Sequence, residues 1–129
     1  MRALLDTQAF LFWNLDVGRL SKRAFDLIGD EANEVYVSVA SAWEISIKYA
    51  KGHLRLEEGE PGAWVPSRIA LDGLQILNIE LTHALRAGAL PPMHKDPFDR
   101  LLIAQAQLER LPILTSDPNF ARYEVEVIW

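Results

Sequence analysis

Short apolar runs alternate along the chain with stretches whose apolar residues recur at helical spacing. Runs at residues 3–5, 35–39, 74–79 and 113–115 have the length and composition of buried strands. Residues 123–127 alternate apolar with acidic side chains, which is typical of a half-exposed edge strand. Strands separated by helices favour right-handed crossovers and a mainly parallel sheet. The pattern therefore predicts an α/β fold, a three-layer α/β/α sandwich around a central sheet of about five strands.

The helices expected between these strands differ in how clearly their ends are marked. They cover about residues 7–14, 22–30, 41–51, 65–71, 82–89 and 98–110. Ser21 is placed to cap the second helix, and Ser41 with Glu44 has the spacing of a capping box for the third. Glycine and proline residues in the stretch 52–66 predict a loop before the fourth. The last helix is apolar on most sides, so we expect it to be buried.

Length and composition restrict the class of protein. A chain of 129 residues predicts one domain, residues 1–129. Its longest apolar run, residues 9–13, is far shorter than the ~18 residues that a membrane span requires, so no membrane association is expected. Asp6 and Gln8 interrupt the apolar start of the chain, which argues against a signal peptide. The absence of cysteine excludes disulfides and thiolate chemistry, and we expect a cytoplasmic protein.

Common nucleotide-binding and hydrolase motifs are missing. The chain has no phosphate-binding loop, no dinucleotide fingerprint, no nucleophile elbow and no zinc-protease helix motif. The three histidines, His53, His83 and His94, are scattered, so a histidine-rich metal site is not expected. The candidate chemistry is left to the carboxylates.

Several carboxylates follow the ends of predicted strands. Asp6 terminates the first strand, Glu44 lies a few residues beyond the second, and Asp117 terminates the strand at residues 113–115. Asp96 and Asp99 open the long last helix. Because the carboxyl ends of parallel strands share one edge, where ligand sites of α/β sheets form, we expect these acids to lie together.

Each of these acids also has a purely structural explanation. Asp6, Asp96 and Asp117 have the positions of helix N-caps, Glu44 completes the box opened by Ser41, and Asp99 suits a first helical turn. For the group as a whole this explanation is weaker, because clustered carboxylates repel one another unless they hold a cation. Oxygen ligands without histidine or cysteine favour Mg²⁺ or Mn²⁺, which activate water and stabilise the oxygens of a phosphoryl displacement.

Four segments in order along the chain carry a family resemblance. They are Leu-Leu-Asp-Thr at residues 4–7, residues 37–44, residues 94–106, and Leu-Thr-Ser-Asp at residues 114–117. Together they resemble the acidic motifs of PIN-domain nucleases, and most closely those of VapC-type toxins from bacterial and archaeal toxin–antitoxin pairs. The resemblance implies a PIN-like fold and an endoribonuclease dependent on Mg²⁺ or Mn²⁺. It also implies a homodimer held by a cognate antitoxin.

The resemblance assigns roles to individual residues. The catalytic and metal-binding quartet maps onto Asp6, Glu44, Asp99 and Asp117. Asp96, Thr115 and Ser116 occupy supporting positions beside this quartet.

Net charge at first argues against RNA as a substrate, because 18 acids face 13 bases. Setting aside Asp96 and the four acids of the quartet leaves 13 acids against 13 bases, so RNA binding is allowed. Lys48, Lys95 and Arg100 flank the acidic motifs and are candidates for phosphate contacts. The alternative for these bases is a solvated helix face.

Two other functions compete with the nuclease. One is a non-catalytic RNA-binding or regulatory module of the same fold. The other is an aspartate-based phosphotransfer domain, which fits poorly because Asp6 has no second aspartate two residues later and no lysine follows Thr115. For the tryptophans, we expect Trp43 in the core, and Trp13 and Trp64 on surfaces available to a partner.

Overall fold

The central element of the computed structural model, which describes residues 1–129, is a five-stranded sheet. Its strands are β1 (Arg2–Leu5), β2 (Glu34–Ser38), β3 (Gln75–Leu77), β4 (Ile113–Leu114) and β5 (Val127–Ile128). They lie in the order β3-β2-β1-β4-β5, and every neighbouring pair is parallel. This confirms the predicted α/β class, with a sheet that is wholly parallel.

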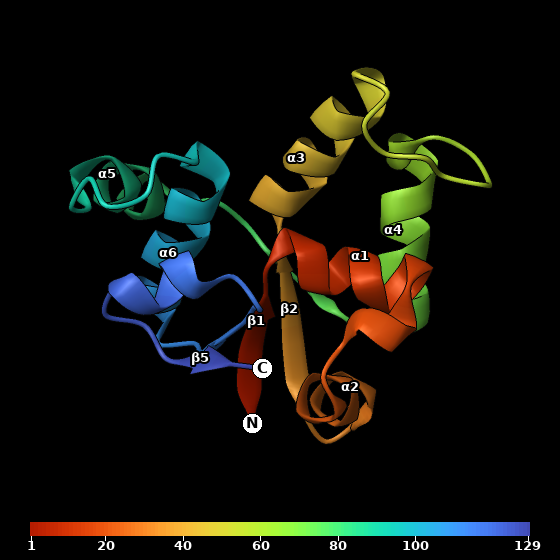
Figure 1. Ribbon diagram of the computed structural model, residues 1–129, viewed down its shortest axis with the longest axis horizontal. Coiled ribbons are helices and arrows are strands. Elements are labelled where there is room, and N and C mark those ends of the chain that lie inside the picture. Colours follow the sequence, from red (N-terminus) through yellow and green to blue (C-terminus); the bar gives the residue numbers. More distant parts are fainter.

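Helices cover both faces of the sheet. They are α1 (Thr7–Leu15), α2 (Lys22–Gly29), α3 (Val39–Ala50), α4 (Pro61–Asp72), α5 (Leu81–Ala89) and α6 (Pro97–Glu109), with short 3-10 turns η1 (Val17–Arg19) and η2 (Pro118–Arg122). In Figure 1, α1, α2 and α4 lie on one side of β1 and β2, and α5 and α6 lie on the other. The three-layer arrangement is therefore confirmed.

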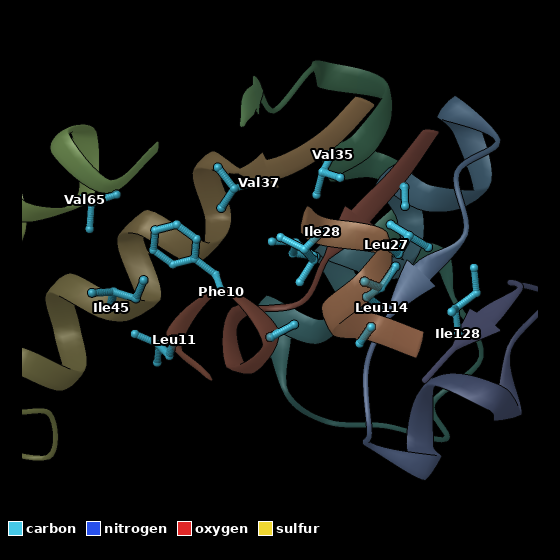
Figure 2. Packing of buried hydrophobic residues seen from close by; sticks show 14 of the residues in the cluster. Phe10, Leu11, Leu27, Ile28, Val35, Val37, Ile45, Val65, Leu114 and Ile128 are labelled. Carbon is cyan, nitrogen blue, oxygen red and sulfur yellow. The ribbon is translucent and has the colours of Figure 1, made fainter. Parts of the chain in front are cut away.

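The alternation of side chains along each strand produces two separate cores. Ala3 and Leu5 of β1 enter one cluster with α1, α2 and α4, whereas Leu4 enters a second cluster built mainly on α6. The first cluster has 15 buried residues, among them Phe10, and Figure 2 shows its packing around that ring. The second has 10 buried residues and includes the apolar side of α6, which is buried as expected. Burial on both faces makes the sheet the fixed platform of the molecule.

Helix α3 begins earlier than its sequence predicts. Its N-cap is Ser38, whose hydroxyl accepts a hydrogen bond from the amide of Ala40 at 3.0 Å. Ser41 lies inside the first turn, fully buried, where its hydroxyl accepts a hydrogen bond from Thr7 at 2.9 Å. The predicted capping box of Ser41 and Glu44 is therefore wrong, because Ser38 already ends the strand and caps the helix.

Two other boundaries also differ from the prediction. Helix α4 starts at Pro61, at the N1 position that favours proline, and runs through Pro66 at the cost of one backbone hydrogen bond. The last strand is β5, later and shorter than residues 123–127, because η2 and the buried Tyr123 precede it. None of these helices could span a membrane.

Two of the three tryptophans, Trp43 and Trp64, are placed differently from the expectation. Trp43 is 60% exposed and packs edge-to-face against Phe98, with ring centroids 5.1 Å apart. Trp64 is only 6% exposed and lies against Phe10 in the first cluster. The glycine- and proline-rich sequence around Trp64 suggested an exposed loop. This stretch instead forms the start of helix α4, which packs over the sheet and buries the Trp64 ring.

Candidate metal centre

Three strands deliver acids to one edge of the sheet. β1 ends directly before Asp6, β2 leads into α3 with Glu44 in its second turn, and β4 leads through Thr115 to Asp117. Because β1 lies between β2 and β4 in a parallel sheet, these carboxyl ends are neighbours. Figure 1 shows α1 and α3 both starting from this edge. The predicted meeting of the acids at one edge follows from this order of strands.

A polar pocket of about 200 Å³ lies at this edge. Its lining contains no hydrophobic residue and consists of Asp6, Thr7, Gln8, Glu44, Lys48, Asp96, Asp99, Ser116 and Asp117. Five carboxylates thus face one ammonium group. The structure brings together all four acids of the expected quartet, along with Asp96, Ser116 and Lys48.

Asp6 is the most buried of these acids. Its Oδ1 accepts a hydrogen bond of 2.7 Å from the amide of Ala9, so it caps α1. Burial raises the pKa of Asp6 to about 7, against the lowering effect of the Thr115 hydroxyl and the Ala9 amide, and the charges of Asp99 and Asp117 raise it further. The site therefore holds an acid whose negative charge is poorly solvated.

Glu44 has one partnered and one unpartnered oxygen. Its Oε2 lies 3.1 Å from the Nζ of Lys48, one helical turn further along α3. Its Oε1 is buried and has no hydrogen-bond partner in the chain. Such an oxygen is costly in a folded protein unless something outside the chain binds it.

Asp99 is paired with a histidine that the sequence analysis missed. The Nε2 of His94 lies 2.7 Å from the Oδ2 of Asp99. Burial raises the pKa of Asp99 to about 6, and the charges of Asp96 and Glu44 add to this while His94 opposes it. Ligand atoms of His94, Asp99 and Asp117 all lie within 4.8 Å of one another. The sequence feature that points to this pair is its spacing. His94 lies only five residues before Asp99, in a stiff segment bounded by prolines.

The supporting residues are bound to the backbone around the pocket. The Oδ1 of Asp96 accepts hydrogen bonds from the amides of Phe98 and Asp99, capping α6. The Oδ1 of Asp117 caps η2 through the amide of Asn119, and the hydroxyl of Thr115 accepts from the amide of Asp117 at 3.0 Å. Thr115 is buried beneath the pocket, whereas Ser116 is exposed at its lining.

The three candidate phosphate-binding residues separate in the structure. Lys48 lines the pocket beside Glu44. Lys95 is exposed and outside the pocket lining. Arg100 donates hydrogen bonds to the carbonyl oxygens of Ala87, Leu90, Pro91 and His94. Its guanidinium is therefore engaged with backbone, and we correct the expectation that it is available for phosphate.

The donor set fits a hard divalent cation. Every charged ligand candidate of the quartet is a carboxylate, the chemistry that Mg²⁺ and Mn²⁺ prefer. The raised pKa values of Asp6 and Asp99 and the unpartnered Oε1 of Glu44 are features that a bound cation would relieve. Asp6, Glu44, Asp99 and Asp117 are the residues that would hold it.

Solved structures with the same fold are complexes of toxins and antitoxins. VapBC2 from Rickettsia felis, bound to a DNA fragment from its promoter, has a TM-score of 0.71 at 15% identity, covering 99% of this chain and 98% of that chain. A toxin–antitoxin complex from Klebsiella pneumoniae has a TM-score of 0.66 at 24% identity, covering 98% and 96%. FitAcB from Neisseria gonorrhoeae has a TM-score of 0.66 at 19% identity, covering 100% and 97%. At these identities the similarity establishes the fold.

The sequence itself identifies the family. No curated protein matches the sequence. The family model of the PIN domain, however, matches residues 3–126, which is nearly the whole chain and includes every acid of the pocket. The chain therefore belongs to the PIN-domain family.

Proposed function

We propose that this chain is the toxin of a toxin–antitoxin pair and an endoribonuclease dependent on Mg²⁺ or Mn²⁺. Membership of the PIN-domain family and a fold shared with toxin–antitoxin complexes support the class of protein. The acidic pocket supports catalysis by the residues Asp6, Glu44, Asp99 and Asp117. Residues 1–129 form a single nuclease domain in this proposal.

The observation that carries the proposal is the unpartnered Oε1 of Glu44. A buried carboxylate oxygen without a hydrogen bond costs about 1–3 kcal/mol or more for a charged group. A purely structural glutamate at this position has no reason to retain that cost. A glutamate that binds a cation regains the interaction when the cation arrives.

In this proposal each residue at the pocket has a separate role. The four carboxylates would hold the cation, which when bound would supply an activated water and stabilise the oxygens of a phosphoryl displacement. Asp96 and Thr115 fix the backbone that carries Asp99 and Asp117. Lys48, at the pocket lining, is the base best placed to attract an RNA phosphate. Lys95 extends the same attraction outside the pocket.

The partners of the protein follow from the same proposal. We infer an RNA substrate, a homodimer and a cognate antitoxin that binds the free toxin in the cytoplasm. Two of the structural neighbours are bound to DNA, one of them to a fragment of its promoter, and that DNA is a ligand of those complexes. RNA is the substrate class proposed for this chain.

Cleavage of RNA by the purified, antitoxin-free protein tests the proposal. Activity should require Mg²⁺ or Mn²⁺ and disappear in EDTA. Glu44→Gln, which keeps the size of the side chain, should lose activity by orders of magnitude with an unchanged circular dichroism spectrum. Glu31→Gln, at an exposed glutamate outside the pocket, is the matched control and should cleave normally.

Two outcomes would contradict the nuclease. Full activity in EDTA would contradict metal dependence. RNA binding without cleavage under any Mn²⁺ concentration would favour the non-catalytic module of the same fold.

A further inference from the structure

His94 is held through its backbone amide, its backbone carbonyl and one ring nitrogen. Its backbone amide donates a hydrogen bond to the hydroxyl of Tyr123 at 2.9 Å, and its carbonyl accepts one from Arg100 at 3.2 Å. Its ring nitrogen Nε2 lies 2.7 Å from the Oδ2 of Asp99. The two backbone contacts fix where the residue lies, and the ring contact then directs the imidazole at that carboxylate.

The segment that carries His94 is anchored by the same two residues. Arg100, in the first turns of α6, binds the carbonyls of Ala87 and Leu90 at 2.8 Å each and that of Pro91 at 3.0 Å. The hydroxyl of the buried Tyr123 donates to the same Pro91 carbonyl at 2.8 Å. The connection between α5 and α6 is therefore clamped to α6 on one side and to the chain after η2 on the other.

We propose that His94 is a positioning residue for Asp99, held in place by Arg100 and Tyr123. Its Nε2–H binds one carboxylate oxygen, Oδ2, and so fixes the orientation of the group. The other oxygen, Oδ1, has no hydrogen bond within the chain and is left for the cation. This inference rests on the proposed function, because His94 orients Asp99 only if Asp99 binds the cation.

Hydrogen bonds of this kind are known to orient metal ligands. A partner that restrains a ligating side chain typically changes metal affinity by about 10–100-fold when it is removed. Direct ligation by Nε2 is the competing role. It conflicts with the 2.7 Å contact, because one ring nitrogen cannot both donate a proton to Asp99 and bind a cation.

Mn²⁺ titrations followed by electron paramagnetic resonance test the inference without any substrate. His94→Ala should weaken Mn²⁺ binding about 10–100-fold. His94→Gln, which retains an N–H donor at a similar reach, should restore most of the affinity. Tyr123→Phe, which removes the hydroxyl that binds both the His94 amide and the Pro91 carbonyl, should weaken binding by a smaller factor. His53→Ala, at an exposed histidine that is distant from His94 in the sequence, is the control and should bind Mn²⁺ as the unmodified protein does.

The outcomes are separable. Unchanged Mn²⁺ affinity in His94→Ala, or failure of glutamine to restore a lost affinity, would overturn the positioning role. Pulsed resonance on the Mn²⁺-loaded protein should show no directly bound histidine nitrogen, and a strong nitrogen coupling would make His94 a ligand instead. An unmodified, folded protein that binds no Mn²⁺ would overturn the proposed function together with this inference. If His94→Ala does not fold, the glutamine and Tyr123→Phe variants still decide the question, since each leaves a side chain of similar size in place.

Discussion

Three acids of the pocket use one carboxylate oxygen to cap the backbone. Asp6, Asp96 and Asp117 each direct Oδ1 to backbone amides at the start of a helix or 3-10 turn. Serine would cap equally well, but its single oxygen would leave nothing for the pocket. Capping and cation binding are therefore compatible, and at Asp6 and Asp117 the cap fixes the carboxylate that would serve the cation.

Replacing Asp99 by asparagine tests whether this residue binds a cation or only interacts favourably with the helix dipole. Since burial raises the pKa of Asp99 to about 6, its charge is costly without a cation, and the metal-free variant should unfold no more easily than the unmodified protein. Mn²⁺ at a hundredfold excess over its Kd should stabilise the unmodified protein by about 2.7 kcal/mol and the variant much less. Thermal melts with EDTA and with Mn²⁺ measure both effects. A loss of about 0.3–1 kcal/mol regardless of metal would indicate a dipole effect only.

Asp6 should make the metal-free protein less stable as pH rises. The pKa of Asp6 is about 7 in the folded chain and near 3.8 when unfolded, so the folded state binds more protons between these values. The stabilising contribution is complete below about pH 4 and is lost by about pH 7, a change on the order of a few kcal/mol. Urea unfolding in EDTA from pH 5 to 8 should show this decline. Asp6→Asn should reduce it markedly, and an unchanged slope in that variant would exclude Asp6 as its source.

The acids of the pocket were predictable from sequence, whereas their partners were not. Asp6 and Asp117 follow apolar runs directly, so the rule for parallel strand ends is enough to place them. The contacts of His94 and Arg100 depend on how the segment between α5 and α6 folds back, and no local pattern encodes that path. For this reason Arg100 was mistaken for a phosphate ligand and His94 for a scattered histidine.

At the scale of elements, two serines at the start of α3 distinguish the observed cap from the predicted one. Ser38 caps the helix, and its hydroxyl donates to the buried Oε1 of Gln105 at 2.6 Å. Ser38→Ala should therefore cost about 1–3 kcal/mol of unfolding free energy, since it removes a cap and leaves a buried amide oxygen unpaired. Ser41→Ala loses only the contact with Thr7 and should cost less. Urea unfolding of the two variants measures this, and a larger loss in Ser41→Ala would restore the predicted cap.

Element types followed from periodicity more reliably than element ends did. The strands at β1, β2 and β4 and the long α6 were clear because their buried faces impose uniform apolar runs. The start of α3 was misplaced because Val39 suits a strand and a helix equally, and the decision rests on the tertiary bond from Ser38 to Gln105. Residues 123–125 were misassigned for a similar reason, since the hydroxyl of Tyr123 ties it to Pro91 and to His94 instead of to a neighbouring strand.

For the whole molecule, charge is concentrated where the strands end. The chain carries a net charge of −5, and the pocket lining has five acids and one base. The acidic balance therefore belongs to the proposed metal centre, and bound cations would remove much of it. A polyanionic substrate would then meet a nearly neutral surface, with Lys48 inside the pocket and Lys95 outside it.

At the scale of the whole molecule, we expect the chain to associate with a second copy and with an antitoxin. Large apolar side chains remain mostly exposed, with Leu71 at 72%, Leu81 at 75% and Leu85 at 66%. Burial of such area is favourable by about 25 cal/mol per Å², and the homodimer implied by the family resemblance would bury some of these side chains. Light scattering at micromolar concentration should give about twice the chain mass of 14.6 kDa, with or without Mn²⁺, since the pocket is lined by polar groups and not by these residues. A co-expressed antitoxin should bind more tightly than the second copy, so its complex should survive dilution that dissociates the dimer. A strict monomer under these conditions would contradict the homodimer and leave the metal centre unaffected.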